Sequence, residues 1–149
     1  MSSATGILII NGPNLNMLGV REPGIYGTET LEEIRTACVA RAATAGTTVD
    51  FRQSNSEAEL IGWIQESRGN FAGIIINPAA FTHTSVAIHD ALVLSELPVI
   101  EVHLSNIFRR EPFRHHSYVS PVARGIISGF GAHGYVLAID ALVRLIVEA

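Results

Sequence analysis

Five short runs of apolar, largely β-branched residues alternate with helical patterns along the chain. This alternation limits the possible folds more strongly than any other feature. The runs are Gly6–Ile10, Thr47–Gln53, Gly73–Ile76, Pro98–Val102 and Gly125–Ser128. Strands that are apolar on both faces and are separated by helices indicate a parallel sheet covered on two sides.

Capping patterns mark where the helices begin and end. Thr30-x-x-Glu33 and Ser56-x-x-Glu59 are capping boxes, which predict helix starts at both places. The first of these helices should run to about residue 45, because Gly46 is suited to the position just after a helix.

Two further helices complete the pattern. One should follow Thr84 or Ser85, and the last should follow Gly134, with Leu142, Leu145 and Ile146 on its inner face. We therefore predict an α/β fold, a flavodoxin-like three-layer sandwich with a five-stranded parallel sheet in the order 2-1-3-4-5. The sequence contains no repeat and no linker, so residues 1–149 are expected to form a single domain.

The segment Asn11–Gly27 is too long for an ordinary connection between a strand and a helix. Such turns usually take about 2–6 residues. Glycines and prolines shape this segment, and its apolar residues can pack it down: Leu15, Met17, Leu18 and Ile25. An ordered long loop at the carboxyl end of a strand is often functional. Its two chemically capable side chains are those of Arg21 and Tyr26.

Composition narrows the class of protein. A net charge of -4 gives no basic footprint for nucleic acid, and no apolar run approaches the roughly 18 residues of a membrane span. Charged residues make up only 16% of the chain, which favours buried subunit contacts, although extra core burial would explain the same number. The chain shows no signal peptide, and its single cysteine, Cys38, is expected to be a packed side chain in a reducing, cytoplasmic compartment.

The chain contains no lysine, since all ten of its cationic side chains are arginines. A lysine Schiff base, a pyridoxal enzyme and a P-loop are therefore excluded. There is also no G-x-G-x-x-G or G-x-S-x-G pattern, and the adjacent His115 and His116 are only a weak metal signal. Acid–base chemistry without a metal or cofactor is the remaining option.

Polar residues follow three of the predicted strands. They are Asn11 and Asn14, residues 77–83 and residues 103–106. In a sheet of this kind the carboxyl ends of neighbouring strands meet at one edge, where ligands bind. We therefore expect these three loops to form one pocket.

Tyr26 and His103 are the candidates for proton transfer. A phenol with a pKa near ~10 is a poor base, but a nearby guanidinium such as that of Arg21 favours the phenolate. The alternative is that Tyr26 packs the loop and Arg21 lies at the surface. A histidine at the end of a strand can exchange a proton near neutral pH, and the alternative for His103 is a hydrogen-bonded core residue.

Several neighbouring residues have an equally plain structural interpretation. Thr84 and Ser85 fit N-capping as well as ligand contact. Asp90 falls inside the helix that follows them, so it is expected to point toward a neighbouring subunit rather than into its own pocket. The arginines in residues 109–114 either close over an anion or decorate the surface.

Five segments, in order along nearly the whole chain, resemble the type II 3-dehydroquinate dehydratases. They read N-G-P-N-L-N-M-L-G-x-R-E-P-x-x-Y-G, R-Q-S-N-S-E, N-P-A-A-F-T-H-T-S-V-A, I-E-V-H-L-S-N and F-R-H-H-S-Y. The resemblance implies conversion of 3-dehydroquinate to 3-dehydroshikimate and water, in the shikimate or quinate pathway. It also implies no cofactor and a homododecamer built as a tetramer of trimers. The missing lysine then favours an enolate route over the imine route of the unrelated type I enzymes.

The resemblance also implies a role for each matching residue. Tyr26 removes the proton next to the ketone, Arg21 lowers the pKa of Tyr26, and His103 protonates the departing hydroxyl. Asn14 helps to hold a water that stabilises the enolate. The residues implied in substrate binding are Asn77, His83, Leu104 through its backbone, Ser105, Arg114, and Asp90 from a neighbouring subunit.

Two departures from the family pattern and two rival functions stay open at this point. Phe81 stands where a tyrosine is common, which puts a contact of its loop in doubt. Phe108 stands where a small residue or a histidine is common, which puts closure of the neighbouring arginine segment in doubt. The rivals are a module that binds a nucleotide or flavin, and a non-catalytic assembly subunit on the same scaffold.

Overall fold

The protein folds around one parallel sheet. The computed structural model describes residues 5–20, 22–26 and 28–149, and of Pro23 and Tyr26 only the backbone. The strands are β1 (Ile7–Asn11), β2 (Val49–Gln53), β3 (Gly73–Asn77), β4 (Val99–His103) and β5 (Gly125–Ser128). They are all parallel, in the order β2-β1-β3-β4-β5, which confirms the predicted fold and strand order.

Three strands extend one residue further than their apolar runs. β1, β3 and β4 end on Asn11, Asn77 and His103, because the backbone ladder continues through a polar residue as readily as through an apolar one. Asn11 and Asn77 lie directly opposite each other in the β1–β3 pair. The first residue of each polar group expected beyond these strands therefore belongs to the strand itself.

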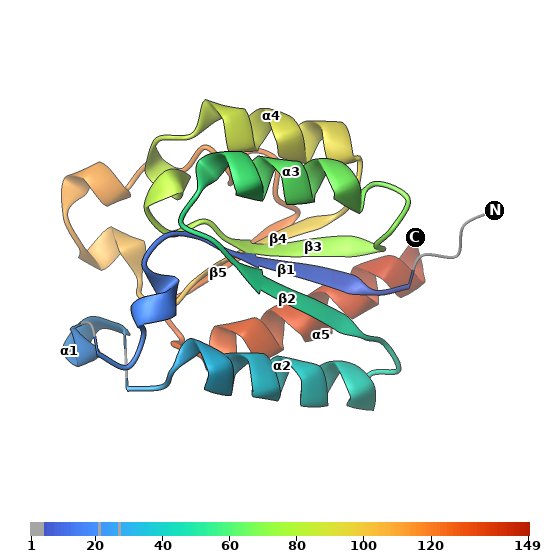
Figure 1. The fold of residues 1–149 in the computed structure, drawn as a ribbon, viewed down its shortest axis with the longest axis horizontal. Coiled ribbons are helices and arrows are strands. Elements are labelled where there is room, and N and C mark those ends of the chain that lie inside the picture. Colours follow the sequence, from blue (N-terminus) through green and yellow to red (C-terminus); the bar gives the residue numbers. More distant parts are fainter. Residues whose placement is uncertain (1–4, 21, 27) are drawn as a thin grey trace.

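Two helices cover each face of the sheet (Figure 1). Helices α2 (Leu31–Thr44) and α5 (His133–Glu148) pack on one face, and α3 (Glu57–Ser67) and α4 (Val86–Ser95) pack on the other. A short helix, α1 (Pro23–Tyr26), and four 3-10 turns lie in the connections. The turns are η1 (Leu15–Met17), η2 (Ala79–His83), η3 (Ile107–Arg109) and η4 (Pro112–Arg114). Among the residues that the structure describes, no helix has the length and apolar character needed to cross a membrane.

The predicted helix caps are present. The Thr30 hydroxyl accepts from the Glu33 N–H at 3.2 Å, and the Glu33 carboxylate accepts from the Thr30 N–H at 3.4 Å, which completes the capping box. At α3 and α4 only the serine half of such a cap is formed. The Ser56 hydroxyl accepts from the Glu59 N–H, and the Ser85 hydroxyl accepts from the Ile88 N–H. Gly46 has a φ of +80°, the left-handed conformation expected just beyond α2.

Alternation along the strands divides the core between the two faces. Ile7 and Ile9 of β1 pack toward α2 and α5, whereas Leu8 and Ile10 pack toward α3 and α4. Leu142 of α5 is buried in the core on the α2–α5 side, and Leu145 and Ile146 pack against the same core, as predicted. Cys38 is buried in the same layer, and burial raises the pKa of its thiol to about 12, so it is a packed side chain.

The long loop after β1 is only partly packed down. Leu15 and Leu18 are buried beside the α2 layer, as expected. Met17 and Ile25 are also expected to pack, but Met17 is 50% exposed and Ile25 is 44% exposed. Arg21 and Gly27 lie outside the described residues.

A close backbone contact ties the β1 loop to the β3 loop. A Cβ atom added at Gly12 would lie 2.4 Å from the carbonyl oxygen of Pro78, a distance that side chains do not tolerate. The Gly12 N–H also donates to the Asn77 carbonyl at 2.8 Å. Only a residue without a side chain allows the two loops to meet so closely.

We predict that Gly12→Ala lowers the free energy of unfolding by about 1–3 kcal/mol, because the backbone must move to relieve the clash. Gly62→Ala is the matched control, since Gly62 lies in α3 with open space around it and should gain up to about 1 kcal/mol in helix propensity. Urea unfolding measures both variants. Equal stability of the two variants would show that the β1 and β3 loops are not tightly packed.

Candidate active site

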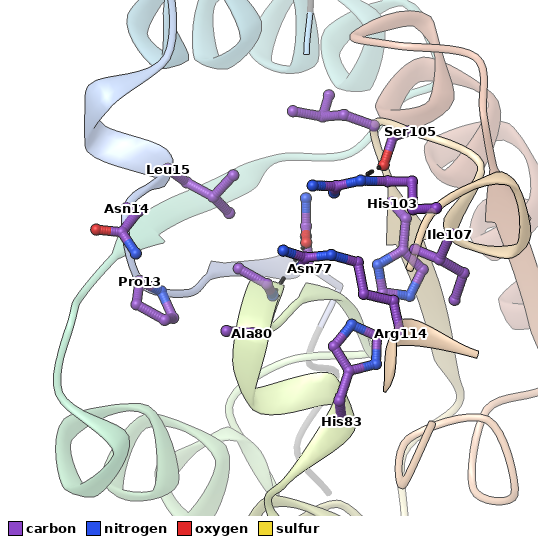
Figure 2. Close-up of a pocket in the computed structure, with 13 residues that line it drawn as sticks. Pro13, Asn14, Leu15, Asn77, Ala80, His83, His103, Ser105, Ile107 and Arg114 are labelled. Carbon is purple, nitrogen blue, oxygen red and sulfur yellow. Dashed lines mark hydrogen bonds between the residues drawn. The ribbon is translucent and has the colours of Figure 1, made fainter. Parts of the chain in front are cut away.

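A pocket lies beyond the carboxyl ends of β1, β3 and β4, where the three polar loops meet. Figure 2 shows Pro13, Asn14 and Leu15 on one side of it, with His83, His103 and Arg114 on the other. The full lining comprises Pro13, Asn14, Leu15, Asn77, Ala79, Ala80, His83, His103, Leu104, Ser105, Ile107, Arg110 and Arg114. The structure thus brings together six of the residues predicted for binding, with His103 beside them.

The imidazole of His103 is held by a buried carboxylate. Its Nε2 lies 2.5 Å from Oε2 of Glu101, and both side chains are almost completely removed from solvent. Because a carboxylate accepts hydrogen bonds, Nε2 carries the hydrogen and Nδ1 is left for exchange with a ligand. His103 is buried, yet it also lines the pocket, so its burial does not separate it from a ligand.

Glu101 is itself fixed by two serines. The Ser120 hydroxyl donates to Oε1 at 2.6 Å, and the Ser117 hydroxyl donates to Oε2 at 2.9 Å. Burial works to raise the pKa of Glu101, but hydrogen bonds from His103, Ser120 and Ser117 outweigh it and hold the pKa below its ordinary value. Glu101 is therefore an ionised group inside the protein, aimed at one imidazole nitrogen.

The sequence contains a signal for Glu101 that does not depend on any motif. A lone acidic residue in the middle of a buried, apolar strand is costly unless it is paired. Glu101 also stands two residues before His103, which places both side chains on the same face of β4. The two serines lie 16 and 19 residues away in the connection to β5, so spacing alone could not have identified them.

His83 presents one nitrogen to the pocket. Its Nδ1 lies 2.8 Å from the carbonyl oxygen of His116, so Nδ1 donates and Nε2 is the acceptor. Partial burial, as the largest cause, lowers the pKa of His83, and the imidazole is neutral at neutral pH. A neutral ring in this orientation accepts a hydrogen bond from a ligand hydroxyl.

Two arginines from the connection after β4 reach the pocket. Arg114 lies against the ring of Phe113 and pairs with Glu111 at 3.2 Å. Arg110 pairs with the same carboxylate at 3.6 Å, and it donates to the Ser105 hydroxyl at 3.3 Å. The sequence indicated that this segment could close over an anion. It did not single out Arg110, which the structure places beside Ser105.

Asn77 and Asn14 differ in how exposed and how firmly held their side-chain amides are. Asn77 is 3% exposed, and both ends of its amide are hydrogen-bonded within the protein. Asn14 is exposed at the pocket edge in the left-handed conformation, with its N–H donating to Asn55 Oδ1 at 2.9 Å. Asn77 is a rigid wall of the pocket, and Asn14 is an accessible amide at its mouth.

Arg21 lies outside the described residues, and only the backbone of Tyr26 is described, at the end of α1. The preceding residues, Gly24 and Ile25, line a second hollow. That hollow shares Leu104, Ser105 and Arg110 with the first pocket. The segment that leads into Tyr26 therefore borders the same cleft as the residues that follow His103.

Other predicted residues lie outside this pocket. Asp90 is exposed on α4 and does not contribute to the lining. Ser85 caps α4, which is the structural interpretation offered for it. Phe81 packs into the core on the α3–α4 side, whereas Phe108 is 63% exposed with its ring 5.6 Å from that of His115.

A family model for dehydroquinase class II matches residues 5–143. The chain belongs to the class II dehydroquinase family. It is 63% identical over 134 residues to 3-dehydroquinate dehydratase 2 of Pseudomonas aeruginosa, covering 90% of each chain. It is 59% identical over 140 residues to 3-dehydroquinate dehydratase of Streptomyces coelicolor, covering 93% of this chain and 89% of the relative.

Solved structures of the family share the fold closely. The type II dehydroquinase from Propionibacterium acnes superimposes with a TM-score of 0.91 at 45% identity, covering 95% of this chain and 97% of that one. The enzyme from Butyrivibrio crossotus gives a TM-score of 0.90 at 48% identity, covering 94% and 98%. The resemblance inferred from the five sequence segments is thereby confirmed.

We predict that Glu101→Gln destabilises the protein by about 1–3 kcal/mol at neutral pH, because a charged acceptor is lost from a buried network. The folded-state pKa of Glu101 is depressed, so its stabilisation is complete above the ordinary carboxyl pKa of about 4.3 and is lost as the pH falls through the folded value. The gap between wild type and variant should therefore narrow below about pH 4.

Urea unfolding at a series of pH values tests this expectation. Glu148→Gln is the control, because its ion pair with Arg144 is exposed and should change stability by no more than about 0.5 kcal/mol. A gap that widens on acidification would mean that Glu101 is protonated in the folded state.

Proposed function

We propose that this chain dehydrates 3-dehydroquinate to 3-dehydroshikimate by acid–base elimination through an enolate. The observation that carries the proposal is that His103 lines the pocket with its imidazole held by Glu101, in a member of the class II dehydroquinase family. The chain has no lysine with which to form an imine, so the alternative route through a covalent adduct is closed to it.

His103 is the proposed acid. In its imidazolium form, His103 keeps the Nε2 hydrogen on Glu101 and gives the Nδ1 proton to the hydroxyl that departs as water. The fixed carboxylate also keeps the ring in one orientation through the reaction, so Glu101 is a positioning residue.

Tyr26 is the proposed base, and Arg21 is the charge that favours its phenolate. The phenolate takes the proton from the carbon next to the ketone, and the electron pair passes to the ketone oxygen as an enolate. Return of that pair expels the hydroxyl and forms the conjugated enone. The support for this assignment is the family match of the loop, together with the hollow that Gly24 and Ile25 line in common with Ser105.

The remaining pocket residues suit a small polyhydroxylated carboxylate. The hydroxyl of Ser105, with the backbone that follows His103, is proposed to bind the carboxylate, and Leu104 contributes through that backbone. Neutral His83 and cationic Arg114 are proposed to bind hydroxyls, one as acceptor and one as donor. Asn77 binds the substrate from the pocket wall, and Asn14 holds a water against the enolate.

The test is direct: purified protein mixed with 3-dehydroquinate should release a conjugated enone, seen as rising ultraviolet absorbance. No turnover by the intact assembly would contradict the proposal and favour the non-catalytic subunit. A yellow protein that retains flavin through purification would favour the nucleotide or flavin module.

We predict that Tyr26→Phe lowers kcat by at least about a hundredfold, because general-base catalysis contributes roughly that much. Tyr118→Phe is the matched control, since its half-buried ring packs edge-on to His116 and its hydroxyl makes no hydrogen bond within the part of the chain that the structure describes. Steady-state rates and thermal melting are measured for both. A near-normal rate for the folded Tyr26→Phe protein would make the base assignment wrong.

We further propose a homododecamer, a tetramer of trimers, located in the cytoplasm. Helix α4 supports the assembly: Val86, Val93 and Leu94 are each more than half exposed, and Asp90 lies among them. A neighbouring subunit packed on this face would cover the apolar side chains and receive Asp90 at its own pocket. The buried, unpaired thiol of Cys38 supports a reducing compartment.

We predict that Val93→Arg reduces the assembly to smaller species, because it places a charge where the apolar face of α4 meets its neighbour. Val147→Arg, on the exposed last turn of α5, should leave the assembly intact. Light scattering after gel filtration gives the mass of each. An unchanged mass for Val93→Arg would place the subunit contacts elsewhere.

A further inference from the structure

We propose that Tyr135, buried beneath the sheet, is a positioning residue that fixes the orientation of Asn77 in the pocket wall. Tyr135 lies near the start of α5, is fully buried, and is outside the set of residues that line the pocket. The inference rests on the proposed function, because it concerns how Asn77 meets the substrate.

Four hydrogen bonds connect the backbone of β2 to the pocket wall through these residues. Asn11 Nδ2 donates to the Arg52 carbonyl at 3.0 Å, and the Tyr135 hydroxyl donates to Asn11 Oδ1 at 2.6 Å. Asn77 Nδ2 donates to the Tyr135 oxygen at 3.0 Å, and the Ala79 N–H donates to Asn77 Oδ1 at 3.2 Å. Each bond joins elements that are distant in the sequence, except the last.

The two ends of this chain determine its direction. The Arg52 carbonyl can only accept, and the Ala79 N–H can only donate. Asn11 must therefore turn its nitrogen to β2 and its oxygen to Tyr135, and the hydroxyl proton of Tyr135 is committed to Asn11. The Tyr135 oxygen is then an acceptor, so Asn77 has to present its nitrogen to it. One polarity satisfies every group, and the amide of Asn77 cannot turn over without breaking two bonds.

The surroundings enforce this arrangement. Asn11 and Asn77 are register partners at the ends of β1 and β3, and they point to the same face of the sheet, above Tyr135. Burial raises the pKa of the Tyr135 hydroxyl, so it keeps the proton that it donates. Both amides are buried, so bulk water does not readily replace these protein partners.

The same chain also shapes the turn that follows β3. Ala79 has a φ of 52°, the left-handed conformation that residues with side chains seldom adopt. The hydrogen bond from its N–H to Asn77 Oδ1 holds that conformation in place. Ala79 and Ala80 line the pocket beside Asn77, so a rotated amide would disturb this whole wall.

A hydroxyl that only stabilised the core would behave differently from one that acts through Asn77. Loss of stability alone would change the melting temperature but leave the substrate affinity of the folded protein unchanged. Loss of the Asn77 orientation would raise KM in the folded protein. It would do so only when Asn77 still carries an amide to orient.

The experiment is a double-mutant cycle on the full-length protein with 3-dehydroquinate as substrate. We expect Tyr135→Phe to lower kcat/KM roughly tenfold, equivalent to about 1.4 kcal/mol, mainly through KM. In an Asn77→Ala background the same change should lower kcat/KM by less than about twofold, because no amide remains to be positioned. Ser67→Ala is the control, since it removes another fully buried hydroxyl whose partner, the Ile64 carbonyl, lies in α3.

Asn11→Ala provides an independent variant, because it frees the Tyr135 proton to point at Asn77 without removing the ring. It should also raise KM, and it decides the question if Tyr135→Phe does not fold. The inference would be overturned if Tyr135→Phe lowered kcat/KM as much in the Asn77→Ala background as in the wild type. It would also be overturned if Tyr135→Phe lowered the melting temperature but left KM unchanged. Lack of turnover by wild type would instead contradict the proposed function.

Discussion

Parallel pairing of β1, β3 and β4 is the constraint on which the rest of the structure depends. It brings the carboxyl ends of three strands, separated by more than 90 residues of sequence, to a single edge of the sheet. The last residue of each strand is polar: Asn11, Asn77 and His103. Since these residues are still part of the backbone ladder, their Cα positions are as fixed as those of the core. A pocket built on such positions is more rigid than one built on loops alone.

Alternation of side chains across the sheet then separates two buried polar systems. Glu101 and His103 face the α3–α4 side, where Ser117 and Ser120 complete the hydrogen bonding of the carboxylate. Asn11 and Asn77 face the α5 side, where Tyr135 joins them. Both systems are buried in apolar layers, and both end at a side chain that lines the pocket. Buried polar groups are costly when unpaired, so each network has only one satisfactory arrangement.

The two systems suit the chemistry proposed for a class II dehydroquinase. A proton donor needs one nitrogen free and the other held, which a carboxylate on the far side of the ring provides. A substrate with several hydroxyls and a carboxylate needs donors and acceptors whose directions do not change, which rigid amides and a neutral imidazole provide. The arginines after β4 reach the pocket from a less regular connection of 3-10 turns, where adjustment to a ligand is easier.

The sequence alone determined the fold class, the strand order and most helix boundaries, because apolar periodicity and capping are local properties. Thr30 and Ser56 cap the helices at the predicted positions, and Gly46 takes the left-handed conformation just beyond α2. The predicted strand order also placed Asn77, His83, His103 and Ser105 at one edge of the sheet, because it fixes which strand ends are neighbours. Only the tertiary structure brought Glu101 to His103, Arg110 to Ser105 and Tyr135 to Asn77, and only it showed that Met17 and Ile25 are about half exposed. The physical reason is that a hydrogen bond depends on atoms meeting in space: Tyr135 and Asn11 are 124 residues apart, and no local pattern records such a contact.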